Sequence, residues 1–454
     1  MRTSEPLYII KKDNTGTPGI FIYDDDVALM KQIYFHRTMR AVSIHELMNE
    51  LQDGQKSAIA ISKRLGKLTR SRLLVQIKQP TSGRYTHYHY KLGLKGIEVL
   101  SQIEPTLFGQ VDDLKSFVSN ASVPSAHTAA ASTIANWVYL ACLKDTALRG
   151  CYHARGSNHE LFNQSPAEGL QSPIVPDWVF EHRDTVVCVE VDTGSQRQQT
   201  IINKYRRYIE LAKELNKQGK KMFVVFSVVD ETVDVAYSDN RQRRSAYLKE
   251  LAPPVQEWGV DSKHNENLGI SFYVLTAKRT PPLIREMLAG FLPFTTKARG
   301  QNAKDWMLKA NHVLRDTCTF TSVENDAIFN PRRDRSMDTD LIIQMERKDR
   351  HDKNRFLAVI YGEEGSVLTH QLIKTNALRL SQWQGEQRVS SPDLLVCYDD
   401  VENVVNDVHG FDMPCRVIEV AYGDWLTAQR ENMAPPRVME VVSPFKKEWR
   451  EFDE

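Results

Sequence analysis

Residues 174–212 read IVPDWVFEHRDTVVCVEVDTGSQRQQTIINKYRRYIELA, and this stretch decides the fold of the middle of the chain. Its pattern predicts a short apolar strand that follows Asp177, a polar turn, a β-branched strand and a long amphipathic helix. Side chains alternate between the two faces of a strand, so Glu190 and Asp192 share one face. Pairing of the two strands would bring Asp177 beside Glu190. Carboxylates gathered at a strand end repel one another unless they hold a cation or a proton.

The composition is that of an ordinary soluble globular protein. The 454 residues are 41% hydrophobic and 26% charged, and the net charge of +1 does not indicate a partner. The six cysteines lie far apart without a C-x-x-C pair, which favours a reducing compartment over a structural zinc site. No apolar run approaches the ~20 residues of a membrane span, and the first residues lack a signal-peptide pattern. We therefore expect a cytoplasmic protein without membrane contact.

The first hundred residues predict a small helical domain that ends in a hairpin. Helices are expected over 26–35, 43–51, 55–69 and 94–103, the second opened by a capping box at Ser43, with a hairpin over 73–92. Three helices followed by a hairpin is the element order of the winged-helix variant of the helix-turn-helix fold.

The charge of this region indicates a nucleic-acid partner. Residues 55–95 contain ten Lys or Arg residues and no acid. Basic residues confined to the third helix and the hairpin fit phosphate contact and insertion into the major groove of duplex DNA. The alternative is a solvated helix face. The candidate DNA-binding residues are Lys56, Ser57, Lys63, Arg64, Lys67, Arg70, Arg72, Lys78 and Arg84.

The middle region resembles a known fold. Its predicted order is helix, three strands, helix, strand, helix and strand, and its motif residues are Pro176-Asp177, Glu190-Val191-Asp192 and Lys204. This pattern resembles the PD-(D/E)XK nuclease-like fold. Together with the winged helix ahead of it, roughly residues 25–230 resemble the replication-relaxation family of plasmid and mobile-element proteins.

The resemblance implies a candidate catalytic site of Asp177, Glu190, Asp192 and Lys204. In the nuclease fold the Asp and the Glu hold Mg²⁺, which polarises the scissile phosphate and activates water. The lysine normally stands two residues after the Glu, where this chain has Asp192, so Lys204 would have to substitute from the helix. The alternative is a degenerate site whose carboxylates are hydrogen-bonded to the following helix N-terminus.

Residues 300–454 repeat the same order of elements. Asp340 takes the place of Asp177, and the strand LAVIYG (357–362) corresponds to VVCVEV, which puts Tyr361 in the place of Glu190. Because the strand carboxylate is missing, we expect an inactive scaffold for dimerisation, DNA-backbone contact or partner docking. The tail, 435–454, is expected to fray.

These patterns predict a multidomain α/β protein. The expected parts are a winged-helix domain (1–104), a linker (105–125), a PD-(D/E)XK nuclease-like domain (126–290) and a degenerate second copy (291–454). The expected function is double-stranded DNA binding in the replication, transfer or regulation of a plasmid, phage or other mobile element. A homodimer and replication, transfer or transposition proteins are expected partners. The alternatives are a Mg²⁺-dependent nickase or endonuclease and a protein-interaction scaffold.

Overall fold

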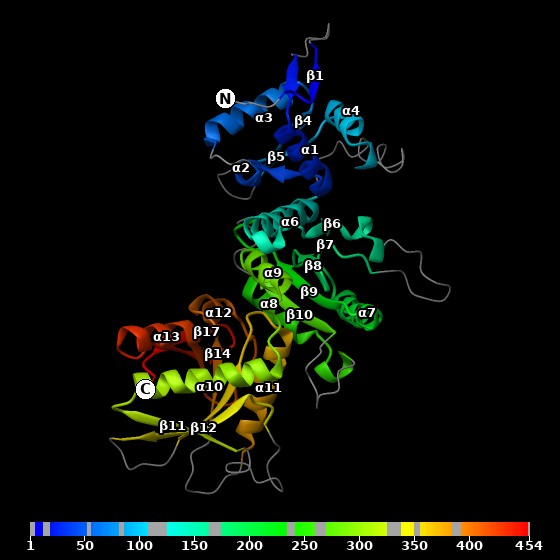
Figure 1. The fold of residues 1–454 in the computed structure, drawn as a ribbon. Coiled ribbons are helices and arrows are strands. Elements are labelled where there is room, and N and C mark those ends of the chain that lie inside the picture. The colour runs from blue at the N-terminus through cyan, green and yellow to red at the C-terminus, as the bar shows by residue number, and fades with distance from the viewer. Residues whose placement is uncertain are drawn as a thin grey trace. The chain divides into compact units, whose positions relative to one another are not determined.

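The chain is a mixed α/β protein, as its sequence predicts. A computed structural model describes residues 5–11, 19–51, 56–80, 86–107, 125–162, 174–233, 241–258, 269–324, 337–348, 355–383 and 392–452 (Figure 1). Two compact units are present. The first comprises residues 1–193, 229–239 and 276–289, and the second comprises 194–228, 240–275 and 290–454. The domain boundaries expected at 104, 125 and 290 stay predictions.

The N-terminal part of the first unit contains the predicted helices and hairpin. Its elements are β1 (Tyr8–Ile10), β2 (Ile20–Ile22), α1 (Asp24–His36), β3 (Met39–Arg40), α2 (Ala41–Glu50), α3 (Ala58–Arg70), β4 (Leu74–Pro80), β5 (Thr86–Leu92) and α4 (Leu94–Ile103). Strands β1 and β2 pair antiparallel, and a separate three-stranded sheet has the order β3-β5-β4. Its register pairs Met39 with Tyr90 and Leu74 with Leu92.

One local prediction in this region is wrong. The second helix does not begin with a capping box at Ser43, because β3 leads directly into α2 and the N-cap is Arg40 in extended conformation. Ser43 is therefore buried inside the helix. At the other end of this region, the backbone at Gly93 lies close to that of Arg72. A side chain does not fit between them, since a Cβ on residue 93 would lie 2.2 Å from the carbonyl oxygen of Arg72.

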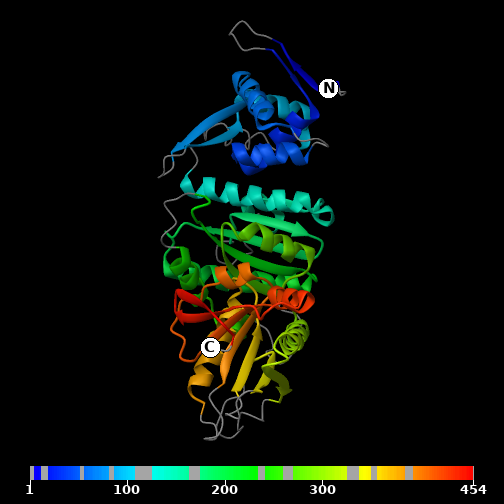
Figure 2. The same cartoon turned by 90° about the vertical axis from the view of Figure 1, so that its left-hand side faces the viewer.

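Helix α6 (Ala126–Lys144) joins the N-terminal elements to a group of strands in the same unit. Leu140 belongs to the N-terminal hydrophobic core, and the Ser132 hydroxyl donates to the backbone oxygen of His36 at 2.7 Å. On its other side, α6 lies along β6 (Tyr152–Ala154), β7 (Trp178–His182) and β8 (Thr185–Asp192), as Figure 2 shows. Helix α9 (Thr280–Ala289) packs beside α6. Neighbouring strands in β6–β8 are antiparallel.

The strands of the middle region form one sheet. Its order is β10-β9-β8-β7-β6. The remaining elements of the region are α7 (Gln198–Lys217), β9 (Lys221–Val228), α8 (Arg241–Glu250) and β10 (Ile270–Thr276). Strand β8 is buried along its whole length, which explains its continuous apolar and β-branched sequence.

The C-terminal part of the second unit has a seven-stranded sheet. Its elements are α10 (Thr296–Val313), β11 (Cys318–Val323), β12 (Leu341–Arg347), β13 (Arg355–Tyr361), α11 (Val367–Ser381), β14 (Asp393–Tyr398), α12 (Val401–Asn406), β15 (Val417–Ala421), α13 (Tyr422–Glu431), β16 (Val438–Ser443) and β17 (Lys446–Arg450). The strand order is β11-β12-β13-β14-β15-β16-β17, and the pairs β13·β14 and β14·β15 are parallel.

The C-terminal sheet shares its strand order with the middle sheet. Strands β11–β15 follow one another in the sheet in chain order, as β6–β10 do, and the helices between them also correspond.

The prediction that residues 435–454 fray is wrong for most of this tail. Strands β16 and β17 pair with each other, and β16 pairs with β15, so that Val438 is fully buried. None of the helices in the described ranges is both long and apolar enough to cross a membrane.

Candidate nucleic-acid interface and strand-end carboxylates

Helix α3 separates an apolar face from a basic face. The Ser57 hydroxyl caps its N-terminus by accepting from the backbone N–H of Ala60 at 3.2 Å. The buried face consists of Ile61, Leu65 and Leu68. On the other face the side chains of Lys63, Lys67 and Arg70 are exposed. Their spacing of four and three residues aligns them in one row along the helix.

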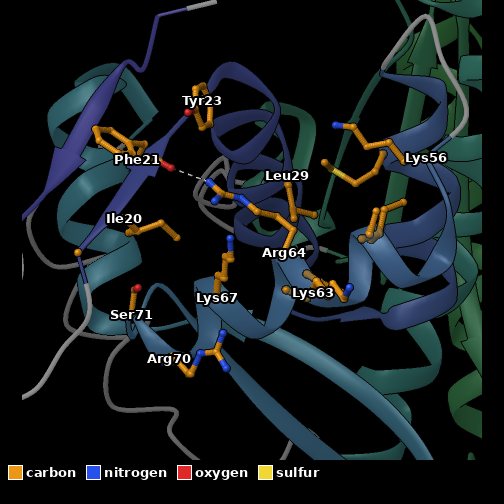
Figure 3. Close-up of a pocket in the computed structure, with 15 residues that line it drawn as sticks. Ile20, Phe21, Tyr23, Leu29, Lys56, Lys63, Arg64, Lys67, Arg70 and Ser71 are labelled. Carbon is orange, nitrogen blue, oxygen red and sulfur yellow. Dashed lines mark hydrogen bonds between the residues drawn. The ribbon is translucent and has the colours of Figure 1, made fainter. Parts of the chain in front are cut away.

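The row formed by Lys63, Lys67 and Arg70 is accessible to a ligand. Within the described parts of the chain, Lys63, Lys67 and Arg70 form no ion pair with a carboxylate. They line a cavity of about 600 Å³ between α3 and the segment from Gly19 to Tyr23, together with Arg64 (Figure 3). The cavity therefore presents several positive charges and few acids on the face expected to meet DNA.

Arg64 lines the same cavity and also connects three elements of the fold. Its Nε donates to Asp26 Oδ1 at 2.8 Å, and one terminal nitrogen donates to Asp26 Oδ2 and to the backbone oxygen of Phe21 at 2.7 Å. The guanidinium also lies 5.7 Å from the ring centroid of Tyr23. Because these contacts occupy the guanidinium, Arg64 connects α3 to β2 and α1. That Arg64 contacts DNA stays a prediction.

The remaining predicted DNA-binding residues surround the basic row. Lys56 also lines the cavity, and its amine lies 3.4 Å from an Asp25 oxygen. Arg72, which has a positive φ of 56°, and Lys78 on β4 are exposed. Arg84 lies outside the described residues. The cations predicted on the third helix thus line one cavity, and Arg64 among them is paired with Asp26.

Asp177 is engaged by groups of its own chain. One carboxylate oxygen accepts from the backbone N–H of Val191 at 2.8 Å, and the same oxygen lies 3.4 Å from His127 Nε2. The His127 ring also lies 3.1 Å from the Val191 carbonyl oxygen. Burial lowers the pKa of the nearby Arg155 guanidinium, and the Asp177 charge opposes this effect. Two basic side chains therefore surround this carboxylate.

The other predicted catalytic residues are distributed around it. Glu190 and Asp192 are both buried on β8. Burial raises the pKa of the Cys188 thiol, and the charge of Glu190 on the same strand face adds to this effect. Lys204 lies on α7, whose residues belong to the second compact unit, whereas the three acids belong to the first. No group of three or more His, Cys, Asp or Glu side chains within the described residues could hold a metal ion.

Asp340 in the C-terminal sheet repeats the environment of Asp177. Its carboxylate accepts from the backbone N–H of Tyr361 at 2.8 Å, and Arg299 Nε on the preceding helix lies 3.2 Å away. Burial raises the pKa of Asp340, and the Arg299 charge opposes the shift. The predicted alignment was wrong by one residue. Leu341 pairs with Val359 as Trp178 pairs with Val189, so Ile360, and not Tyr361, takes the place of Glu190.

Sequence reasoning missed the basic residues that contact these acids. His127 and Arg299 each lie within the first four residues of the helix that precedes the strands. A capping residue in the sequence, Ser125 or Thr295, marks the start of each helix, so the sequence could have placed a basic side chain in the first turn. Neither residue stands out by composition, because both helices carry further basic residues, Lys144 on α6 and Lys297, Lys304 and Lys309 on α10.

One comparison with known proteins matches part of the chain to a family. Residues 30–226, from α1 to β9, match the model of the replication-relaxation family. This region of the chain is therefore similar to the replication-relaxation family. The match ends ahead of α8, so the C-terminal sheet lies beyond it. No curated protein matches the chain.

Proposed function

We propose that the protein binds double-stranded DNA through a winged helix formed by α1–α3 and the β4–β5 hairpin. Helix α3 is its recognition helix. The match of residues 30–226 to the replication-relaxation family supports a role in the replication, transfer or regulation of a plasmid, phage or other mobile element.

The observation that carries this proposal is the row of Lys63, Lys67 and Arg70. A helix that inserts into the major groove needs one face packed on its own domain and another face that offers cations to phosphates. In α3 the apolar residues occupy the first face and the exposed cations occupy the second. Arg64 assists by fixing the helix to Asp26, which keeps the row in a constant orientation.

We further propose that the two larger sheets are PD-(D/E)XK-like domains with architectural roles. A magnesium site needs carboxylate oxygens that are free to bind the ion. At Asp177 a backbone N–H and His127 already take up one of these oxygens, and Asp340 has the matching contacts with Tyr361 and Arg299. These contacts compete with an ion for the carboxylate oxygens, and we assign no catalytic step to these residues.

A binding measurement on the full-length protein tests the DNA proposal. Fluorescence anisotropy of a labelled duplex of mixed sequence is recorded at increasing salt concentration. We expect binding that weakens linearly in log Kd against log salt, because phosphate contacts release counterions. An absence of binding at low salt, or an affinity that salt does not change, would contradict the proposal.

A further inference from the structure

A second basic groove lies in the first unit, away from α3. It has a volume of about 410 Å³ and is formed by one side of α6, the segment after β9 and the start of α9. Its polar and aromatic lining includes Trp137 and Lys144 on α6, Lys278 and Arg285 near the start of α9, and Glu46 on α2. The groove takes no part in the proposed duplex interface.

The charge of this groove is not balanced. The side chains of Lys144, Lys278 and Arg285 are exposed, and within the described part of the chain none of them forms an ion pair. Glu46 is the single acid among the residues that line the groove. Three cations around one small concave surface repel one another unless an anion is bound. This arrangement favours a ligand with more than one negative charge.

Hydrogen bonds and a cation–ring contact hold the groove in shape. Asp230 is 1% exposed, and its carboxylate accepts from the backbone N–H groups of Thr232 at 3.0 Å and Lys278 at 2.9 Å. Arg40 donates to the Thr232 carbonyl oxygen at 3.3 Å, and its guanidinium lies 5.9 Å from the centroid of the Trp137 ring. The segment after β9, the start of α9 and the indole are thus fixed relative to one another.

The amides at the start of α9 contribute little to anion binding. Pro281 and Pro282 occupy the second and third positions of the helix and have no N–H group. An anion in this groove would therefore depend on the three side-chain cations. Trp137, which is partly exposed, adds a flat apolar surface beside them.

We propose that this groove binds a nucleotide unit, with the base against Trp137 and the phosphates against Lys144, Lys278 and Arg285. An aromatic side chain for stacking and a positive groove for phosphates are the two parts of a single-strand nucleic-acid site. The volume also falls in the range of small-ligand pockets, roughly 300–1,000 Å³. The nucleotide can come from single-stranded DNA or from a free nucleoside triphosphate, since both carry this chemistry.

The test separates the groove from α3 and distinguishes the two sources. All measurements use full-length protein in which Lys63, Lys67 and Arg70 are changed to Ala, so that α3 contributes little. One probe is a labelled oligo(dT) followed by anisotropy, and the other is dATP followed by calorimetry. In this background the groove variants are Lys144→Ala with Arg285→Ala, Lys278→Ala alone, and Trp137→Leu. The control is Lys297→Ala with Lys304→Ala, which removes two exposed charges from α10.

For the probe that binds, we expect Trp137→Leu to weaken affinity about tenfold, because stacking of one base is lost. The double neutralisation should lower the salt slope of oligo(dT) binding by about 1.4, or roughly 0.7 for each phosphate contact. Lys278→Ala should also weaken binding. Because the Lys278 side chain is exposed, this substitution should leave the fold intact. Loss with oligo(dT) assigns the site to single-stranded DNA, and loss with dATP alone assigns it to free nucleotide. Binding of neither probe, or groove variants that equal the control, would overturn the inference.

Discussion

The Arg64 guanidinium bonds both carboxylate oxygens of Asp26, whose side chain is completely buried. Asp26 also accepts from the backbone N–H of Tyr23 at 2.9 Å, at the start of α1. One ion pair thus fixes the first helix, the strand ahead of it and the proposed recognition helix. The other cations of α3 remain on its outer face.

Replacement of Arg64 should destabilise the N-terminal region. Arg64→Ala leaves the Asp26 carboxylate buried without its cation, which costs roughly 3–5 kcal/mol in the free energy of unfolding. Arg64→Lys should restore only part of this stability. The lysine keeps the positive charge, but its ammonium cannot bond both carboxylate oxygens as the guanidinium does. Thermal unfolding followed by circular dichroism measures the effect, with Lys63→Ala as the neighbouring exposed control. If both alanine variants unfolded at the same temperature, the ion pair would have no structural role.

Acid should destabilise the first unit through a buried pair of histidines. The ring of His36 stacks on Trp178 at 4.8 Å and on His153 at 5.1 Å between ring centroids. Burial lowers the pKa of His153 to about 4 and lowers that of His36 well below its ordinary value. Since the unfolded chain binds these protons more readily, stability is complete above about pH 6.5 and falls as the pH drops toward 4.

The pH prediction can be tested with a single variant. For His153 alone, the loss by pH 4 is on the order of 3 kcal/mol. His153→Phe keeps an aromatic ring in the stack with Phe180 and Tyr139 but cannot take up a proton. Melting temperatures measured from pH 7.5 down to 4.5 should therefore fall less for the variant than for the parent. Parallel curves for the two proteins would show that His153 does not couple protonation to unfolding.

The carboxylates of the central sheet should matter for structure rather than for DNA binding or cleavage. The double variant Asp177→Asn with Glu190→Gln should bind duplex DNA as the parent does. We expect the parent itself to leave supercoiled plasmid intact in Mg²⁺ or Mn²⁺. Agarose electrophoresis and duplex anisotropy are the readouts. Nicking by the parent that the double variant abolishes would instead establish the endonuclease alternative.

Local patterns in the sequence were sufficient to predict most elements. The apolar spacing of Ile61, Leu65 and Leu68 predicted α3, and the β-branched run predicted β8. Both elements follow from a periodicity that a few neighbouring residues establish. The positions of Lys63 and Lys67 on the exposed face follow from the same periodicity.

Contacts between distant residues could not be predicted in this way. Arg64 and Asp26 are separated by 38 positions, and although helical periodicity places Arg64 beside the buried face of α3, it does not identify Asp26 as its partner. Pairing of β16 with β15 depends on an edge that exists only in the folded sheet, so a charged tail was expected to fray. The one-residue error at Tyr361 arose because register depends on strand pairing rather than on sequence similarity.

The most direct test of the central claim is the salt dependence of duplex binding by the triple variant Lys63→Ala, Lys67→Ala and Arg70→Ala. Anisotropy titrations over a range of salt concentrations compare it with the parent and with the α10 control, Lys297→Ala with Lys304→Ala. Loss of three phosphate contacts should reduce the slope of log Kd against log salt by about 2.7, with weaker binding at every salt concentration. A slope and an affinity equal to those of the parent would show that α3 does not bind DNA.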